Sequence, residues 1–210
     1  MVMTASIVLL VVAAVVWRVQ STGDRRADLV GAAEITTTTT SSPPSTLPPD
    51  TTTTTTPPPP PSPEVPVGLS IPALGIDSAV VPVGLEPNGE MEVPPASEAG
   101  WYLYGPRPGS SQGTAVIAAH VDYGGERGVF FDLRSLQVGA EVSVNDAAGV
   151  AHRFVVTERY QVDKDELPIE QIFVADGPAG LTLITCGGSF DSGARSYRDN
   201  IVVRAEPSDV

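Results

Sequence analysis

The chain has 210 residues, a formal net charge of −13, a single cysteine and two histidines. Nine of its twelve Lys and Arg residues lie beyond residue 66, scattered among twenty Asp and Glu residues, so the positive surface that nucleic acids require is not expected. One cysteine excludes an intrachain disulfide framework. With two histidines it also leaves too few ligands for a structural zinc, so we expect no metal and no cofactor.

The first segment, Met1–Trp17, is apolar and carries no charge. A helix needs about 20 apolar residues to cross a membrane, so this segment is at the short end of the range. A cleaved signal peptide would end at a small-x-small site, whereas this run ends in an aromatic residue and Arg18. We therefore predict an uncleaved membrane anchor and a short polar tail over residues 1–34.

The second segment is of low complexity, with twelve Thr and eleven Pro in residues 36–66. Such a composition stays extended, so we predict a disordered stalk over residues 35–66 that reaches roughly 95 Å. Basic residues follow the anchor and none precedes it, which would favour a cytoplasmic C-terminal side. A stalk fits the outer face of a cell envelope better than the cytoplasm. We therefore predict that the segment after the anchor lies outside the cell.

Residues 67–210 contain short β-type runs separated by Gly and Pro, in about the commonest domain length. The expected strands are Leu69–Ile71, Ile76–Val83, Thr114–Ala119, Glu141–Val144, His152–Tyr160, Leu181–Thr185 and Ile201–Ala205. A turn at Asp146–Gly149 predicts a hairpin. Helical signal is confined to one turn near Phe130–Leu136 and one near Glu166–Phe173. The fold class is mainly β, a barrel or a sandwich.

Cys186 ends the apolar run from Leu181 and is followed by Gly187 and Gly188. A lone cysteine is more often a small buried hydrophobe. At the end of a strand that opens into a glycine-rich loop, however, the thiol would lie at a rim. The two glycines would then let a substrate backbone approach and leave N–H groups free for an oxyanion.

His120 ends another apolar run and precedes a polar loop. A satisfied surface histidine is an equally good interpretation of that position by itself. His152 begins an alternating strand with no site features around it, and we interpret it as a solvent-facing residue.

Thiol catalysis requires a nucleophile, a proton donor for the leaving amine and a cation or N–H group for the oxyanion. Arg195 and Arg198 are the candidates for the cation. If Ile201 faces the core, strand alternation places Arg198 on the opposite face, barring a bulge. Arg198 is also next to the strand, whereas Arg195 lies in a loop, so we favour Arg198.

These residues carry a family resemblance. The run TLITC at Thr182–Cys186, the run AAH at Ala118–His120 and Arg198 within YRDNIVV resemble the sortase family of cysteine transpeptidases. The resemblance covers residues 67–210, and further matching runs are IPALGID, EVPP, GWY with GPRPG, and GTAVIAAHVD. Within the family, the chain is most similar to actinobacterial class F sortases.

The resemblance implies a closed eight-stranded sortase-type β-barrel on the outer membrane face of a Gram-positive cell. Cys186 would attack the Thr–Gly carbonyl of an LPxTG-like sorting signal. His120 would protonate the leaving amine and then help an amine of a cell-wall precursor or another protein to attack. Arg198 would hold the substrate and the oxyanion. Three further positions match the substrate groove: Ala118, Thr182 and Ile184.

Two other functions stay open. A cysteine hydrolase or endopeptidase would release its acyl group to water. Papain-like enzymes usually place Cys before His, the reverse of the order of His120 and Cys186 here, which disfavours that class. A non-enzymatic envelope binding module would be unaffected by loss of the thiol. No run matches a calcium-binding loop.

Overall fold

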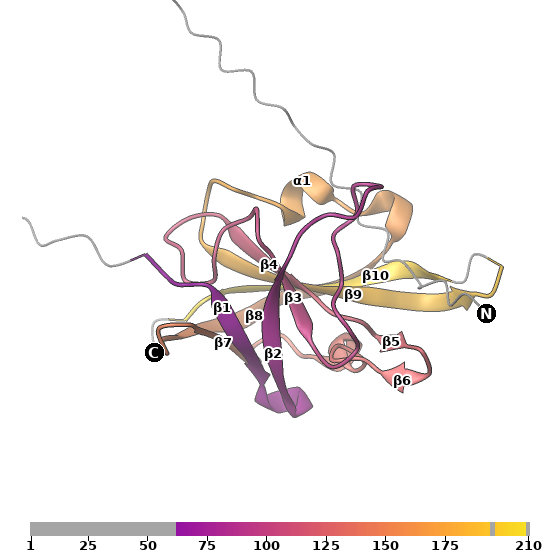
Figure 1. The fold of residues 1–210 in the computed structure, drawn as a ribbon, viewed down its shortest axis with the longest axis horizontal. Coiled ribbons are helices and arrows are strands. Elements are labelled where there is room, and N and C mark those ends of the chain that lie inside the picture. Colours follow the sequence, from indigo (N-terminus) through magenta and orange to yellow (C-terminus); the bar gives the residue numbers. More distant parts are fainter. Residues whose placement is uncertain (1–61, 194–195, 209–210) are drawn as a thin grey trace, which may run out of the picture. The chain divides into compact units, whose positions relative to one another are not determined.

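The structure is a computed structural model that describes residues 62–193 and 196–208 (Figure 1). The predicted anchor at residues 1–34 and nearly all of the predicted stalk at residues 35–66 lie outside the described residues. Among the described residues, no helix combines the length and the apolar character that crossing a membrane requires.

The elements follow one another along the described chain as short strands with few helical turns. The strands are β1 (Pro66–Ile71), β2 (Ile76–Val83), β3 (Ala99–Tyr102), β4 (Thr114–Ala118), β5 (Asp122–Tyr123), β6 (Glu126–Arg127), β7 (Glu141–Asp146), β8 (Ala151–Asp163), β9 (Gly180–Asp191) and β10 (Ser196–Pro207). The helical segments are the 3-10 turns η1 (Pro72–Leu74), η2 (Leu133–Ser135) and η3 (Lys164–Glu166), and the short helix α1 (Ile169–Ile172).

Eight of these strands close a barrel in the order β1-β2-β3-β4-β9-β10-β8-β7. The pairs β2–β3 and β4–β9 are parallel, and the other pairs of the barrel are antiparallel. Strands β5 and β6 form a separate two-stranded ribbon. Figure 1 shows β9 and β10 as the two long neighbouring strands, with β5 and β6 on the same side of the view. The predicted closed eight-stranded, mainly β fold is confirmed.

The β1–β2 connection shows how local sequence builds one corner of this barrel. Pro72 has a fixed φ and begins η1, and Gly75 ends it in the left-handed region with φ 64°. The chain then reverses, and Ile71 pairs with Ile76 across the corner. The two residues that interrupt the apolar pattern of the sequence are therefore the ones that turn the chain.

Alternation along the strands separates two apolar clusters on opposite faces of the sheet. All eight barrel strands supply the inner cluster, whose members include Leu69, Ile71, Trp101, Ile117, Phe130, Phe154 and Leu183. The outer cluster lies over β3, β4, β9 and β10 and is completed by α1 and the loop after β2. Its members are Val83, Met91, Tyr102, Val116, Ala118, Leu167, Ile172, Ile184, Cys186 and Val202.

The barrel also holds the residues just before the predicted domain boundary at residue 67. Pro66 is buried and begins β1. The N–H of Ala147 donates to the carbonyl of Val65 at 2.9 Å, and Arg107 donates to the carbonyl of Pro63 at 3.0 Å. Residues 63–66, which precede the predicted domain boundary, therefore also contact the barrel.

His152 is not the solvent-facing residue that the sequence suggested. Its side chain is 15 % exposed, and its Nε2 lies 2.9 Å from Oδ2 of Asp146. Oδ1 of Asp146 accepts from the N–H groups of Ala148 and Val150, each at 2.9 Å. The hydrogen bond to His152 and these N–H groups hold the pKa of Asp146 below its usual range. A buried carboxylate needs such partners, and here they fix the β7–β8 turn.

Candidate active site

The parallel pair β4–β9 brings the predicted nucleophile and its predicted proton donor to the same level. Ala118 pairs with Ile184, and the next backbone bond runs from the N–H of Ala119 to the carbonyl of Ile184 at 3.3 Å. The hydroxyl of Thr185 donates to the carbonyl of Ala119 at 2.7 Å. His120 and Cys186 each follow one residue later, and alternation directs both to the outer face of the barrel.

Cys186 does not open into a loop, as the sequence suggested. Strand β9 continues to Asp191, and β10 pairs with it as far as Ser196. Two glycines after the thiol do not end the strand because β10 supplies partners for this stretch, with a register shift opposite it. One of them, Gly188, has φ 71° and lies so close to Asp199 that a Cβ would collide with its carboxylate.

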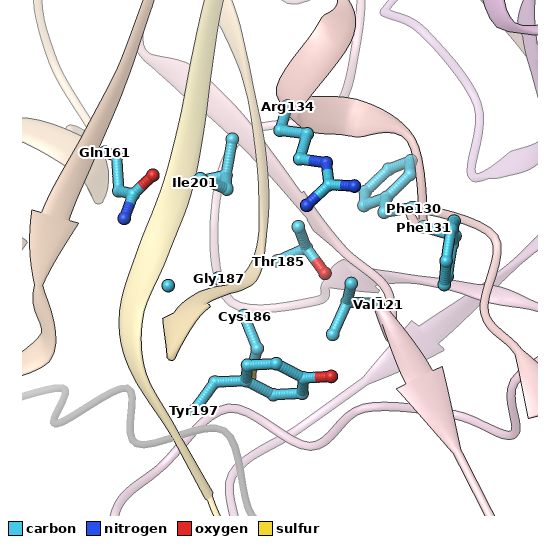
Figure 2. Close-up of a pocket in the computed structure, with 11 residues that line it drawn as sticks. Val121, Phe130, Phe131, Arg134, Gln161, Thr185, Cys186, Gly187, Tyr197 and Ile201 are labelled. Carbon is cyan, nitrogen blue, oxygen red and sulfur yellow. The ribbon is translucent and has the colours of Figure 1, made fainter. Parts of the chain in front are cut away.

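The thiol nevertheless reaches a pocket of about 220 Å³. Cys186 is 8 % exposed. The pocket is lined by Val121, Phe130, Phe131, Arg134, Gln161, Thr185, Cys186, Gly187, Gly188, Tyr197 and Ile201. Figure 2 shows Cys186 and Tyr197 on one side of it and Arg134, Phe130 and Phe131 on the other. The sulfur is therefore packed against apolar side chains while facing an open space.

Charged groups from three separate segments act on the thiol. Burial raises the pKa of Cys186 above its usual value. The charge of Lys164 and a hydrogen bond from it lower the pKa, whereas the negative charges of Asp122 and Glu90 raise it. Burial prevails, so the free protein holds Cys186 mainly as the neutral thiol at neutral pH.

The imidazole of His120 is also held mainly neutral. Burial lowers its pKa below the usual histidine value, and the nearby charge of Asp122 opposes that effect only in part. The ring of Tyr123 stacks on it, with centroids 4.7 Å apart and planes at 27°. The N–H of Phe130 donates to the carbonyl of His120 at 3.1 Å. His120 is thus fixed by its own backbone and by a stacked aromatic ring.

Asp122 links the histidine segment to β10. The hydroxyl of Tyr197 donates to Oδ2 of Asp122 at 2.7 Å, and this hydrogen bond raises the pKa of Tyr197 to about 12. Asp122 also acts electrostatically on both His120 and Cys186. One carboxylate therefore joins β5 to β10 through Tyr197 and lies within electrostatic range of both the thiol and the imidazole.

The guanidinium of Arg198 is bound to Asp191 in this structure. Strand alternation is interrupted at the register shift between Tyr197 and Asp199, and a bulge of this kind invalidates a prediction made from alternation. The side chain of Arg198 is 64 % exposed, and Nη2 lies 3.1 Å from Oδ2 of Asp191. Arg198 is not among the residues that line the thiol pocket. The competing candidate Arg195 lies outside the described residues.

The three predicted groove residues lie together on the outer face but are covered. Ala118 is 1 % exposed, and Thr182 and Ile184 are 0 % exposed. Ala118 and Ile184 belong to the outer cluster together with Leu167 and Ile172. Among the described residues, none hydrogen-bonds the hydroxyl of Thr182, so a polar group is buried there without a partner from this part of the chain.

Sequence reasoning did not find Lys164, Glu90, Asp122, Tyr197 or Arg134. Asp122 and Tyr197 are each close in sequence to a residue that it did single out. Lys164 and Glu90 lie in connecting segments whose place beside the thiol only tertiary structure reveals. Within residues 62–193 and 196–208, no group of three or more His, Cys, Asp or Glu side chains could hold a metal ion. The absence of a metal and of a cofactor stays a prediction.

Comparison with known proteins identifies the class. The described residues form a closed β-barrel in which Cys186 lines a pocket and His120 lies two residues beyond the end of the neighbouring parallel strand. The family model described as Sortase domain matches residues 69–208. The chain belongs to the sortase family. The comparison with curated proteins gave no match.

Solved sortase structures share the fold. The Group B Streptococcus Pilus Island 1 sortase C2 is 19 % identical, with a TM-score of 0.53 over 68 % of this chain and 73 % of that one. Sortase C1 from Streptococcus suis is 18 % identical, with a TM-score of 0.55 over 70 % and 74 %. Sortase C from Clostridium perfringens SM101 is 19 % identical, with a TM-score of 0.51 over 70 % and 72 %. At these identities the matches establish the fold.

Proposed function

We propose that this sortase-family enzyme cleaves an LPxTG-like sorting signal between Thr and Gly and transfers the acyl group to an amine. The observation that carries the proposal is the β4–β9 register, which sets His120 and Cys186 at one level beside a pocket. An apolar cluster, buried in the free protein, lies on the same face of the barrel.

The proposed chemistry has two halves. The Cys186 thiolate attacks the threonine carbonyl, and collapse of the tetrahedral intermediate breaks the C–N bond while His120 gives its proton to the departing glycine amine. A thioester remains. An incoming amine then attacks it, the neutral imidazole takes the amine proton, and Cys186 leaves as the thiolate, which restores the starting pair. The covered, apolar surroundings of the sulfur limit access of water to the thioester.

Attack requires the thiolate and the imidazolium together. Since burial raises the pKa of Cys186 and lowers that of His120, the neutral pair is the more populated one. The pair of thiolate and imidazolium is then a minor form of the free protein, and it is the form that reacts with the substrate. Activity should span a broad pH range between the two pKa values, with a low fraction of active enzyme throughout.

Arg198 is the proposed ligand of the substrate backbone and the oxyanion. Its guanidinium is exposed and bound to Asp191 in the free protein. To serve the oxyanion it must exchange that partner for the substrate. An exposed ion pair contributes about 0–1 kcal/mol, so the exchange costs little.

Ala118, Thr182 and Ile184 are proposed as the floor of the peptide groove. Leu167 and Ile172 belong to the same buried cluster as Ala118 and Ile184, so a peptide that binds here has to displace part of the segment around α1. The unpartnered hydroxyl of Thr182 would then gain a hydrogen bond from the peptide backbone.

The proposed location is the extracytoplasmic side of the cell membrane, facing the cell wall. Residues 1–34 would anchor the chain by a single pass, and residues 35–66 would carry the catalytic domain, residues 67–210, away from the membrane. The charge-free run of Met1–Trp17 and the Thr/Pro-rich composition support this arrangement. Assignment to class F stays a prediction from the sequence resemblance.

The test is an incubation of the full-length chain with an LPxTG peptide, with and without an amine acceptor. Mass spectrometry should detect an acyl adduct on Cys186 and, with acceptor, the transpeptidation product. Cys186→Ala should lose all turnover, and His120→Ala and Arg198→Ala should lose most of it. Free acid formed at the same rate with or without acceptor would identify a hydrolase. Unchanged peptide and no adduct would refute the proposal.

A further inference from the structure

Asn200 on β10 is a buried amide without hydrogen-bond partners. In the described part of the chain, the buried side-chain nitrogen and oxygen atoms that have no partner belong to three residues, Glu90, Thr182 and Asn200. Asn200 differs from the other two because both ends of its carboxamide, Oδ1 and Nδ2, are unpaired, and it is 0 % exposed. Buried polar groups are nearly always hydrogen-bonded, because leaving one unpaired is costly. Asn200 is therefore a candidate ligand for a molecule that binds beside it.

The register of β9 and β10 places Asn200 directly opposite Cys186. Residues directly opposite each other in an antiparallel pair direct their side chains to the same face, with Cβ atoms about 4.5–5.5 Å apart. The register shift of this pair lies between Tyr197 and Asp199, so Asn200 is in the regular part. Its neighbour Ile201 belongs to the inner cluster, which by alternation puts Asn200 on the outer face. The carboxamide is thus a cross-strand neighbour of the thiol.

The same face carries the proposed floor of the peptide groove. Thr182 and Ile184 precede Cys186 on β9 at intervals of two residues, and Val202 follows Asn200 on β10, opposite Ile184. Ile184, Cys186 and Val202 are members of the buried outer cluster. An extended peptide on this floor would therefore reach Asn200 at the point where its carbonyl meets the thiol.

We propose that Asn200 is a catalytic residue that holds the threonine of the sorting signal by its backbone. The N–H and C=O of one residue in an extended strand point to the same side, where a strand partner exchanges two hydrogen bonds with it. A carboxamide offers the matching pair: Nδ2 donates to the threonine carbonyl, and Oδ1 accepts from the threonine N–H. The inference rests on the proposed function, in which the carbonyl of this threonine is the one that Cys186 attacks.

The two hydrogen bonds have different weights in the reaction. Attack by the thiolate turns the threonine carbonyl into an oxyanion, so the bond from Nδ2 strengthens in the transition state. The bond to Oδ1 is the same before and after attack, and it aligns the peptide. Asn200 exchanges no proton and forms no covalent bond.

Asn200 and Arg198 reach the substrate carbonyl from different starting positions. Arg198 has to leave Asp191 before it can bind there, whereas the register of β10 already holds Asn200 beside the thiol. The carboxamide is also buried and unpaired in the free protein, so binding of the peptide satisfies both of its ends. Loss of Asn200 should therefore affect the reaction of the peptide and leave the thiol itself unchanged.

Asn200→Leu removes both hydrogen-bonding groups and nearly keeps the size of the side chain. In the full-length protein, its kcat/KM for an LPxTG peptide should fall by about 100-fold or more, as expected for loss of one oxyanion donor. Its unfolding temperature should equal or exceed that of the wild type, because the carboxamide has no partner to lose. Alkylation of Cys186, the one cysteine of the chain, by iodoacetamide should keep the wild-type rate. Asn145→Leu, the same change at an exposed position of β7, is the matched control and should keep the wild-type rates of cleavage and alkylation.

A change in the substrate tests the second hydrogen bond. An LPxTG peptide in which an ester replaces the x–Thr amide lacks the threonine N–H. The wild type and Asn145→Leu should cleave this ester peptide about fivefold more slowly than the parent peptide, the effect of one neutral hydrogen bond. Asn200→Leu should cleave both peptides at the same reduced rate, because the acceptor of that N–H is already gone.

The outcomes separate this inference from the proposed function. The inference alone is wrong if the wild type cleaves the peptide and folded Asn200→Leu cleaves it equally well, or if the ester lowers the rates of both proteins by the same factor. A lower unfolding temperature together with slower alkylation would show a structural role instead. If the leucine variant does not fold, Asn200→Ala replaces it, and equal cleavage of the two peptides by the wild type would still refute the inference. If the wild type cleaves no sorting peptide, the proposed function fails and this inference fails with it.

Discussion

Gly128 offers a direct way to displace the histidine without changing any group that reacts. A Cβ built on Gly128 would lie 2.0 Å from the carbonyl oxygen of His120 and 2.8 Å from its Cβ. The N–H of Gly128 is itself bound to the carbonyl of Val121 at 2.9 Å, so the glycine cannot move away freely. Gly128→Ala should therefore push the His120 backbone by about 1 Å, since a real Cβ needs at least 3.0 Å.

A shift of this size beside the reacting sulfur should be costly. Misplacement of a catalytic group by about 1 Å lowers rates by about 100-fold, which corresponds to about 2.7 kcal/mol of transition-state stabilisation. We expect this loss in kcat/KM of Gly128→Ala. Gly124 in the same segment is the matched control, because it has φ 63° but nothing within 4 Å of its Cβ position. Gly124→Ala should lose some stability through backbone strain and keep kcat/KM close to that of the wild type.

Cleavage of a fluorogenic sorting peptide measures the effect, and thermal unfolding shows whether each variant is folded. A folded Gly128→Ala variant with wild-type kcat/KM would show that the position of His120 does not limit the reaction. Equal losses in both glycine variants would point to a general disturbance of the segment rather than to displacement of the imidazole.

Three further predictions follow from the same structure. The pH profile of kcat/KM should have its acid limb below the usual histidine pKa of about 6.5 and its basic limb above the usual cysteine pKa of about 8.5. The reason is that burial lowers the pKa of His120 and raises that of Cys186. A profile confined between those two values would contradict this prediction. Asp146→Asn should lower the unfolding temperature at neutral pH, and the difference from the wild type should shrink as the pH falls below the usual aspartate value of about 3.9. The sign follows because the folded pKa of Asp146 is lowered, so its stabilisation is present above the unfolded value and lost on acidification. Phe154 is 2 % exposed in the barrel interior, and Phe154→Ala should cost about 3–5 kcal/mol in the free energy of unfolding, measured by denaturant titration.

The predicted strands were found mainly where alternation or an apolar run was long enough. Ile201, Val203 and Ala205 face the core as the period of two required. The short strand β3 at Ala99–Tyr102 was not predicted, since four residues, all buried, give no alternation to detect. The predicted end of β9 at Thr185 was too early, because pairing with β10 extends the strand through two glycines that alone would indicate a loop.

Cys186 and His120 could be singled out from the sequence because each follows an apolar run, and such a run by itself predicts a buried strand. The placement of the thiol beside the imidazole could not be predicted, because a parallel pairing between segments 66 residues apart has no signature in the sequence of either segment. The charges that act on the sulfur depend on the same long-range packing. Lys164, Asp122 and Glu90 are ordinary polar residues of turns and short strands, and only the closing of the barrel brings their charges within electrostatic range of the thiol. Composition and periodicity thus determined seven of the eight barrel strands and the candidate nucleophile. The strand β3 and the electrostatics around the thiol, which depend on distance in space, were decided by the tertiary structure.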